Sequence, residues 1–299
     1  MPSRIVVMSL LLAAVMGLLA AETPPAGSNS PGSNSPQPEN CSGQAKRLLK
    51  QARRGDVRAE FRVGLALERG EGVGQNYVLA REWYEKAAQA GDPAAQNNLG
   101  ALLAKGLGGA KDDSGAVRWY LRAAVTGLAP AQNNLAYMYS TGQGTNVDVA
   151  EAVRWYSKAA AQNFPIAEEN LAHLYRTGRG VPQDPARAAE LYRRAAEQGY
   201  VPAEENVADM YAAGKGVPRD PAAAARWLRR AAERGSATAQ NNLGFAYEHG
   251  LGVLRDRAMS LFWYRKAAAQ GLTEALKNLT VLQKEQGKTS QTNSEESFR

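Results

Sequence analysis

The chain repeats itself every 36 residues without an insertion. The six full units occupy residues 55–90, 91–126, 127–162, 163–198, 199–234 and 235–270. A partial seventh unit begins at Gly271. A fixed period of this length is typical of solenoids, in which each unit packs only on its neighbours. The repeat therefore outweighs the two ordinary domains that a length of 299 residues would otherwise suggest.

The first part of each unit has the pattern of a helix. Counting from zero within a unit, position 4 is always Ala, position 8 is Val or Leu, and position 12 is Leu or Tyr. This spacing predicts a helix whose core face carries positions 4, 8, 11 and 12. Gly at position 15 predicts the helix end, because Gly adopts the left-handed conformation without a Cβ clash. A second Gly, at position 17, completes a tight turn; no Lys-Ser/Thr follows it, as a phosphate loop would require.

The second part of each unit predicts another helix. Asp or Asn at position 21 is an N-cap residue, and Pro185 and Pro221 follow it in two units. Position 28 is Trp in five units and Leu191 in the other, and an Ala pair at positions 32 and 33 allows close helix packing. Lys or Arg at position 31 complements the helix dipole. The next unit begins with Gly or, once, with Asn163, which tolerates the same conformation. We therefore expect an all-α solenoid.

Half units and non-repetitive segments flank the repeats. Residues 42–54 match a second helix and residues 271–286 a first helix, and these half-repeat helices would cover the terminal faces. Residues 1–21 carry an apolar run of 17 residues behind one Arg, which favours a signal peptide over an uncleaved membrane anchor. Residues 22–41, which contain GSNSP twice, predict a disordered linker, and the polar residues 287–299 a disordered tail.

Composition excludes several kinds of site. One Cys and two His leave no disulfide, metal site or cofactor to expect. Cys41 lies far beyond the apolar run, so it is not a lipidated cysteine. The net charge of +7 is spread along the chain, and the Trp and Tyr residues stand at buried spacing, so we expect no nucleic-acid partner. Paired Glu residues at 168–169 and 204–205 look like acid–base pairs, but they are register copies, and we expect no catalytic residues.

The copy YRTGRGVPQDPARAAELYRRAAEQG, which begins at Tyr175, resembles the Sel1-like repeat, a tetratricopeptide-type α/α repeat with a longer Gly-bearing turn. The resemblance covers residues 55 to about 286. It implies a right-handed superhelix that acts as a non-catalytic scaffold for other proteins. Exported relatives imply a scaffold of the Gram-negative envelope, in the periplasm or secreted, or alternatively a periplasmic inhibitor of a membrane sensor kinase. Relatives with β-lactam affinity carry a disulfide in each repeat, so a β-lactam-binding or cell-wall role is the weaker alternative for a chain with one Cys.

A variable stripe on the first helices is the predicted binding surface. Positions 3, 6, 10 and 13 lie opposite the core face, and in tetratricopeptide-type superhelices this side faces the concave groove. We predict that a protein or peptide partner contacts units two to six there. The predicted contacts are Asn97, Asn133, Tyr137, Glu169, His173, Arg176, Glu205, Asp209, Asn241 and Phe245. Alternatively, the stripe varies because solvent leaves it unconstrained.

Two further expectations concern the repeats. The Asn at position 7 recurs beside the core, and because buried amides are normally satisfied we expect it to hydrogen-bond between repeats. We also expect a monomer that does not insert into a membrane once the signal has been removed.

Overall fold

The computed structural model describes residues 43–284, and all regular structure within them is α-helical. The labelled helices are α1 (Gly43–Ala52), α2 (Val57–Arg69), α3 (Tyr77–Gln89), α4 (Pro93–Lys105), α5 (Asp113–Val125), α6 (Ala129–Thr141), α7 (Val149–Ala160), α8 (Pro165–Thr177), α9 (Pro185–Glu197), α10 (Val201–Ala213), α11 (Pro221–Glu233), α12 (Ala237–His249) and α13 (Arg257–Ala269). A last helical segment covers residues 273–284. The predicted signal peptide, linker and tail lie outside the described residues.

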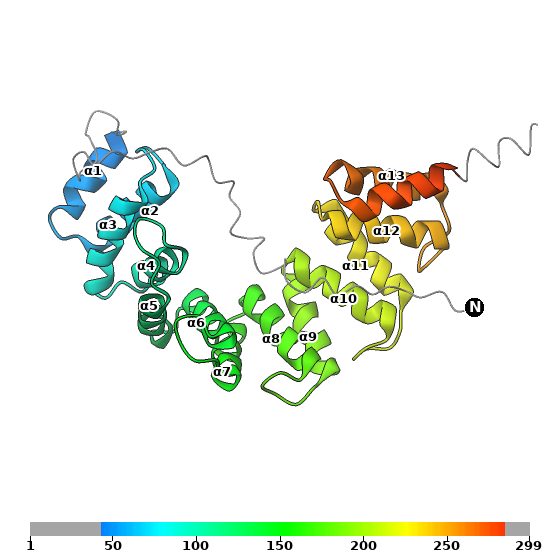
Figure 1. The fold of residues 1–299 in the computed structure, drawn as a ribbon, viewed down its shortest axis with the longest axis horizontal. Helices are drawn as coiled ribbons and strands as arrows, with labels where there is room; N and C mark the ends of the chain where they lie inside the picture. Colours follow the sequence, from blue (N-terminus) through cyan, green and yellow to red (C-terminus); the bar gives the residue numbers. More distant parts are fainter. Residues whose placement is uncertain (1–42, 285–299) are drawn as a thin grey trace, which may run out of the picture. The chain divides into compact units, whose positions relative to one another are not determined.

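The helices pack in chain order as a right-handed α/α superhelix. Each helix contacts the one before it and the one after it in the chain, as Figure 1 shows from α1 to α13. Each 36-residue unit contributes one antiparallel pair, from α2 with α3 to α12 with α13. Helix α1 and the segment 273–284 are the half-repeat helices at the two ends. The solenoid predicted from the period is confirmed.

The predicted helix ends are also confirmed. Gly at position 15 caps every first helix in the left-handed conformation, with φ between 66° and 75°. Asn163 takes the place of a Gly with φ of 57°. At position 21 the Asp or Asn side chain accepts a hydrogen bond from the backbone N–H three residues later in all six units. Local sequence therefore fixes where each first helix ends and where each second helix begins.

The second Gly of the turn does more than shape the turn. A Cβ on Gly216 would lie 2.0 Å from the carbonyl oxygen of Pro185, and one on Gly252 would lie 1.9 Å from that of Pro221. Pro185 and Pro221 begin the second helix of the preceding repeat. The turn of one repeat therefore rests directly on the backbone of the repeat before it, and only Gly leaves room for this contact.

In the core, small residues of the first helices pack with large aromatic residues of the second helices. Every Ala at position 4 is buried, and so are Tyr84, Tyr192 and Tyr264, which occupy position 29 of the second helix. Position 9 of the first helix lies against this ring and is always Gly or Ala. A Cβ on Gly64 would come within 2.6 Å of the Tyr84 ring. A small residue at position 9 therefore admits the tyrosine ring between the two helices.

Candidate functional site

Side-chain hydrogen bonds join neighbouring first helices across the predicted stripe. The amide of Asn134 donates to Oδ1 of Asn97 at 3.0 Å, and Asn170 donates to Oδ1 of Asn133 at 3.1 Å. Asn278 repeats the bond to Asn241 at 3.0 Å, and Asn206 donates to Glu169 at 3.4 Å. The predicted inter-repeat role of the Asn at position 7 is confirmed for these four residues, whose acceptor is the residue at position 6 of the preceding repeat. Asn98 donates instead to the hydroxyl of Tyr84 in the preceding repeat.

These hydrogen bonds between first helices, here called the ladder, involve four of the predicted contact residues. Asn97, Asn133, Glu169 and Asn241 all serve as acceptors in it. Asn133 is buried, with 8% of its surface exposed, whereas the other three are half-buried. Partner contact by these four residues stays a prediction, and the ladder gives each of them a structural role as well. The sequence showed a regular Asn at position 7 but did not show which residue accepts from it.

A group of ionisable side chains occupies the stripe on α8 and α10. Nη2 of Arg176 lies 3.0 Å from Nδ1 of His173. Because a guanidinium can only donate, Nδ1 accepts and the proton of a neutral ring lies on Nε2. Burial lowers the pKa of His173, and the nearby Arg176 and Arg179 lower it further. At neutral pH the imidazole is therefore uncharged, and Arg176 supplies the positive charge beside it.

Two carboxyl groups lie close enough to Arg176 for its charge to lower their pKa values. Burial raises the pKa of Glu169 to about 7, although Arg176 acts in the opposite direction. Burial also raises the pKa of Asp209 on α10, and Arg176 again lowers it. Burial raises the pKa of Tyr192 to about 12, and Arg176 is among the groups that lower it. Arg176 thus contacts His173 and interacts electrostatically with Glu169 and Asp209, and all four residues are predicted contacts.

The raised pKa of Glu169 predicts a pH-dependent stability. The folded carboxyl titrates near pH 7, above its ordinary value of 4.5, so the folded chain holds a proton that the unfolded chain releases. Stability should therefore fall as the pH rises from about 4.5 to about 7, and then level off. Thermal unfolding of Glu169→Gln should lack this component, so the variant should gain melting temperature over the parent at pH 8 but not at pH 5. An equal difference at both pH values would contradict the assignment.

The remaining predicted contacts lie to either side of this group. Tyr137 is half-buried, and its hydroxyl accepts from Nε2 of Gln143 at 3.5 Å. Glu205 accepts from the hydroxyl of Ser236. Phe245 is 44% exposed and stacks on the His249 ring, with centroids 4.0 Å apart. Along the stripe the side chains therefore change from amides through charged groups to an exposed aromatic ring.

The buried carboxylates that resemble acid–base pairs have a packing role. At position 5, Nε2 of Gln132 donates to the carbonyl of Ala124, near the end of the preceding second helix. Repeat 4 carries Glu168 there, and its carboxylate pairs with Arg194 at 2.6 Å. Arg194 donates in turn to the carbonyl of Ala160, which corresponds to Ala124. An ion pair thus replaces an amide at the same junction, which agrees with reading these glutamates as register copies.

The basic residue at position 31 has a second function besides its place near the helix end. Lys158 lies 3.9 Å above the centre of the Trp155 ring, and Arg230 lies 4.4 Å above that of Trp227. Units one, two and six make the same contact. Cation–π contacts between residues three apart therefore use both the charge and the tryptophan of each second helix. Each of these rings therefore has a cation over one of its faces.

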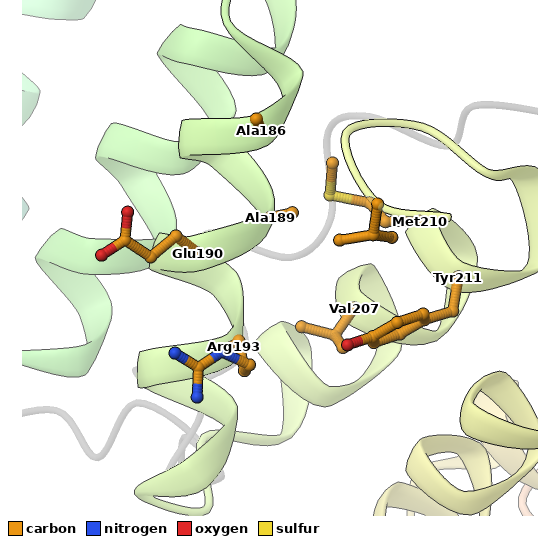
Figure 2. Close-up of a pocket in the computed structure, with 8 residues that line it drawn as sticks. Ala186, Ala189, Glu190, Arg193, Val207, Met210 and Tyr211 are labelled. Atoms are coloured by element: carbon orange, nitrogen blue, oxygen red, sulfur yellow. The ribbon is translucent and has the colours of Figure 1, made fainter. Parts of the chain in front are cut away.

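A cavity of about 250 Å³ lies apart from the stripe, between α9 and α10. Figure 2 shows Ala189 facing Met210 across it. Ala189 stands at position 26, where two repeats carry Val and one carries Leu, and Val207 stands at position 8, where four repeats carry Leu. Because Ala189 and Val207 are smaller than the Val and Leu side chains of those repeats, they leave the cavity unfilled. Arg193 at its edge pairs with Glu197 at 2.5 Å.

Two further observations concern the described residues. Between residues 43 and 284, no group of three or more His, Cys, Asp or Glu side chains could hold a metal ion. Within the same range, no helix has the length and apolar character needed to cross a membrane.

The repeats themselves identify the family. Six consecutive segments match the Sel1 repeat: residues 57–92, 93–124, 129–164, 165–200, 201–236 and 237–272. The chain belongs to the Sel1 repeat family. These segments begin two residues after the units counted from position zero and keep the same 36-residue period throughout; the second, residues 93–124, is shorter than the others. The Sel1 fold is a scaffold that commonly mediates protein–protein interaction.

Solved structures show the same fold in two similar proteins. A Sel1 repeat protein from Oxalobacter formigenes is 35% identical, with a TM-score of 0.73 over 79% of this chain and 68% of that protein. A protective antigen present in uropathogenic Escherichia coli strains is 36% identical, with a TM-score of 0.73 over 79% of this chain. The Sel1 chain described here spans 51% of that antigen's length. No curated protein matches the sequence.

Proposed function

We propose that this Sel1 repeat protein is a non-catalytic scaffold that binds an extended segment of a partner protein along the first helices of repeats two to six. The observation that carries the proposal is the contrast between fixed and variable positions. Core and cap positions keep their residue types through six repeats, whereas position 10 changes from Ala101 through Tyr137, His173 and Asp209 to Phe245. Such a surface offers a different contact to each stretch of one partner segment.

The ionisable group on α8 and α10 would give this surface its specificity. Arg176 is a cation whose charge acts on the carboxyl groups of Glu169 and Asp209, and it lies beside a neutral His173. A pre-formed arrangement of this kind orders little on binding, because the helices already hold the side chains. We expect the partner to place polar or charged side chains here and an apolar side chain near the exposed Phe245.

Site-specific crosslinking in the cell tests this surface. A photo-crosslinking residue in place of Tyr137 or Asp209 should trap a protein partner. The same residue in place of Arg154, an exposed position of the second helix α7, is the matched control and should trap none. Capture from residue 154 alone would move the binding surface to the second helices and refute the proposal.

Alanine variants then separate binding from folding. With the trapped partner purified, Tyr137→Ala and Asp209→Ala should each weaken binding by about tenfold, a usual effect for a central contact. Circular dichroism should show unchanged helicity for both variants, and thermal unfolding of Asp209→Ala should stay within about 0.5 kcal/mol of the parent protein, because Asp209 is exposed. Unchanged affinity in both variants would count against the stripe.

We also propose that the protein acts in the cell envelope, in the periplasm or after secretion. The support is the apolar run of residues 5–21, which has the length and flanking Arg of a signal peptide. Mass spectrometry of the N-terminus of the protein isolated from cell fractions tests this. Cleavage near Ala21 in an envelope fraction is expected, and an intact N-terminus in the cytosolic fraction would refute it.

A further inference from the structure

The N-terminal end of the described chain carries a dense group of cations, here called the N-terminal basic patch. Its members are Lys46, Arg47, Lys50, Arg53, Arg54, Arg58 and Arg62, and all seven are exposed. The same segment, residues 46–62, holds two acidic residues. Seven basic against two acidic residues give it a net charge of +5, compared with +7 for the whole chain. The charge that looks evenly spread in the sequence is therefore concentrated at one end of the solenoid.

The two acidic residues do not neutralise the patch. Asp56 caps α2, where its carboxylate accepts from the backbone N–H of Ala59. Glu60 is buried, with 8% of its surface exposed. No patch residue forms an ion pair with any residue from 43 to 284. The seven charges therefore face the solvent without a counter-charge from the described chain.

Solvating the end of the solenoid does not require these cations. Arg47 stands at position 28, where the full repeats carry Trp or Leu, and Arg62 stands at position 7, where they carry Asn. Polar residues suit such terminal positions because no repeat precedes them, but acidic or neutral ones would serve equally. Position 27 makes the contrast clear. Arg118 and Arg154 stand there and pair with an acidic side chain on the same helix pair, whereas Lys46 pairs with no acidic side chain of residues 43–284.

The chemistry of the patch favours a lipid surface over nucleic acid. Phe61 is the aromatic residue of the segment 43–62, and its ring lies 5.8 Å from that of Tyr84, so it is not free to stack on a base. Clusters of four to eight Lys and Arg are attracted to anionic lipid headgroups. The patch is also the described segment that lies nearest in sequence to the apolar run of residues 5–21, the predicted signal peptide.

We propose that the N-terminal basic patch docks this protein on the surface of a membrane rich in anionic phospholipid, without inserting into it. The attraction is between ammonium or guanidinium groups and lipid phosphates, so it acts over about a Debye length and weakens as salt screens it. Docking through this end would leave the first-helix stripe of repeats two to six open to a partner.

Vesicle co-sedimentation of the full chain, as purified from the expressing cell, tests the proposal. Vesicles of phosphatidylglycerol and phosphatidylcholine in equal parts should bind the protein, and vesicles of phosphatidylcholine alone should not. The triple variant Lys46→Gln/Arg47→Gln/Lys50→Gln should bind the anionic vesicles at least tenfold more weakly. Raising NaCl from about 0.05 M to about 0.5 M should release the parent protein.

A second triple variant controls for total charge. Arg118→Gln/Arg154→Gln/Arg226→Gln removes the same number of charges from second helices far along the chain, and it should bind like the parent protein. Circular dichroism should show equal helicity for both triples. Equal binding by both variants, or binding that resists salt, would overturn the proposal and assign retention to the apolar run. Patch-dependent binding to a single-stranded oligonucleotide, with none to anionic vesicles, would overturn it in favour of nucleic acid.

Discussion

The Gly252→Ala variant is expected to lose at least about 3 kcal/mol of its free energy of unfolding, whereas Gly250→Ala is expected to lose about 1 kcal/mol. Both glycines are left-handed, with φ of 72° and 70°, so the backbone strain of an Ala is the same at both. Their surroundings differ. A Cβ at 252 would lie 1.9 Å from the carbonyl oxygen of Pro221, whereas at 250 the nearest atom lies 3.6 Å away.

Urea denaturation followed by circular dichroism measures both losses. The excess loss in Gly252→Ala reports the contact between the turn of repeat 6 and α11, because local strain cancels in the comparison. Hydrogen exchange should locate the loosened region at the junction of repeats 5 and 6. Equal losses in the two variants would show that the second Gly serves only the conformation of the turn.

Arg194→Ala is expected to destabilise the protein by about 2 kcal/mol, because it leaves the carboxylate of Glu168 buried without its partner. Glu168 has no exposed surface, and Arg194 is its ion-pair partner at 2.6 Å. Burial raises the pKa of Glu168 and Arg194 lowers it, so loss of the arginine should raise it further. The destabilisation should therefore shrink as the pH falls and the carboxyl takes up a proton.

A second substitution should rescue this variant. In repeat 3, Gln162 donates to Oε1 of Gln132, whose Nε2 donates to the carbonyl of Ala124. Repeat 4 already contains Gln198 at the position of Gln162, and it donates to Glu168. Glu168→Gln/Arg194→Ala should rebuild the amide network and recover stability to within about 1 kcal/mol of the parent. A double variant no more stable than Arg194→Ala would show that the two junctions are not interchangeable.

Most of the fold could be predicted from sequence because its determinants are local. A left-handed Gly at position 15, an Asp or Asn cap at position 21 and an apolar face of period four act within one helix, and each recurs six times. The contacts between repeats could not be predicted from sequence in this way. The close approach of Gly216 to Pro185 joins residues of different units, and the Gly reads equally well as a turn residue.

The sequence predicted that the candidate site is a stripe on the first helices, but not which of its side chains interact with one another. The period of the helix placed His173 and Arg176 on one face, and their spacing of three allows the contact seen at 3.0 Å. The period did not predict that Asp209, from the next repeat, lies close enough to Arg176 for the arginine to lower its pKa. It also did not show that Asn97 and Asn133 accept bonds from the following helix, because those partners lie 37 residues away.

By itself, then, the sequence determined the repeat, the helix ends and the solenoid, because backbone conformation and amphipathic periodicity are properties of short segments. Only the tertiary structure decided which side chains meet between repeats. It joined Glu168 to Arg194, left a cavity beside Ala189, and showed that the seven cations of the N-terminal basic patch have no counter-charge among the described residues. Burial and pairing depend on distances between segments, and these exist only once the helices have packed.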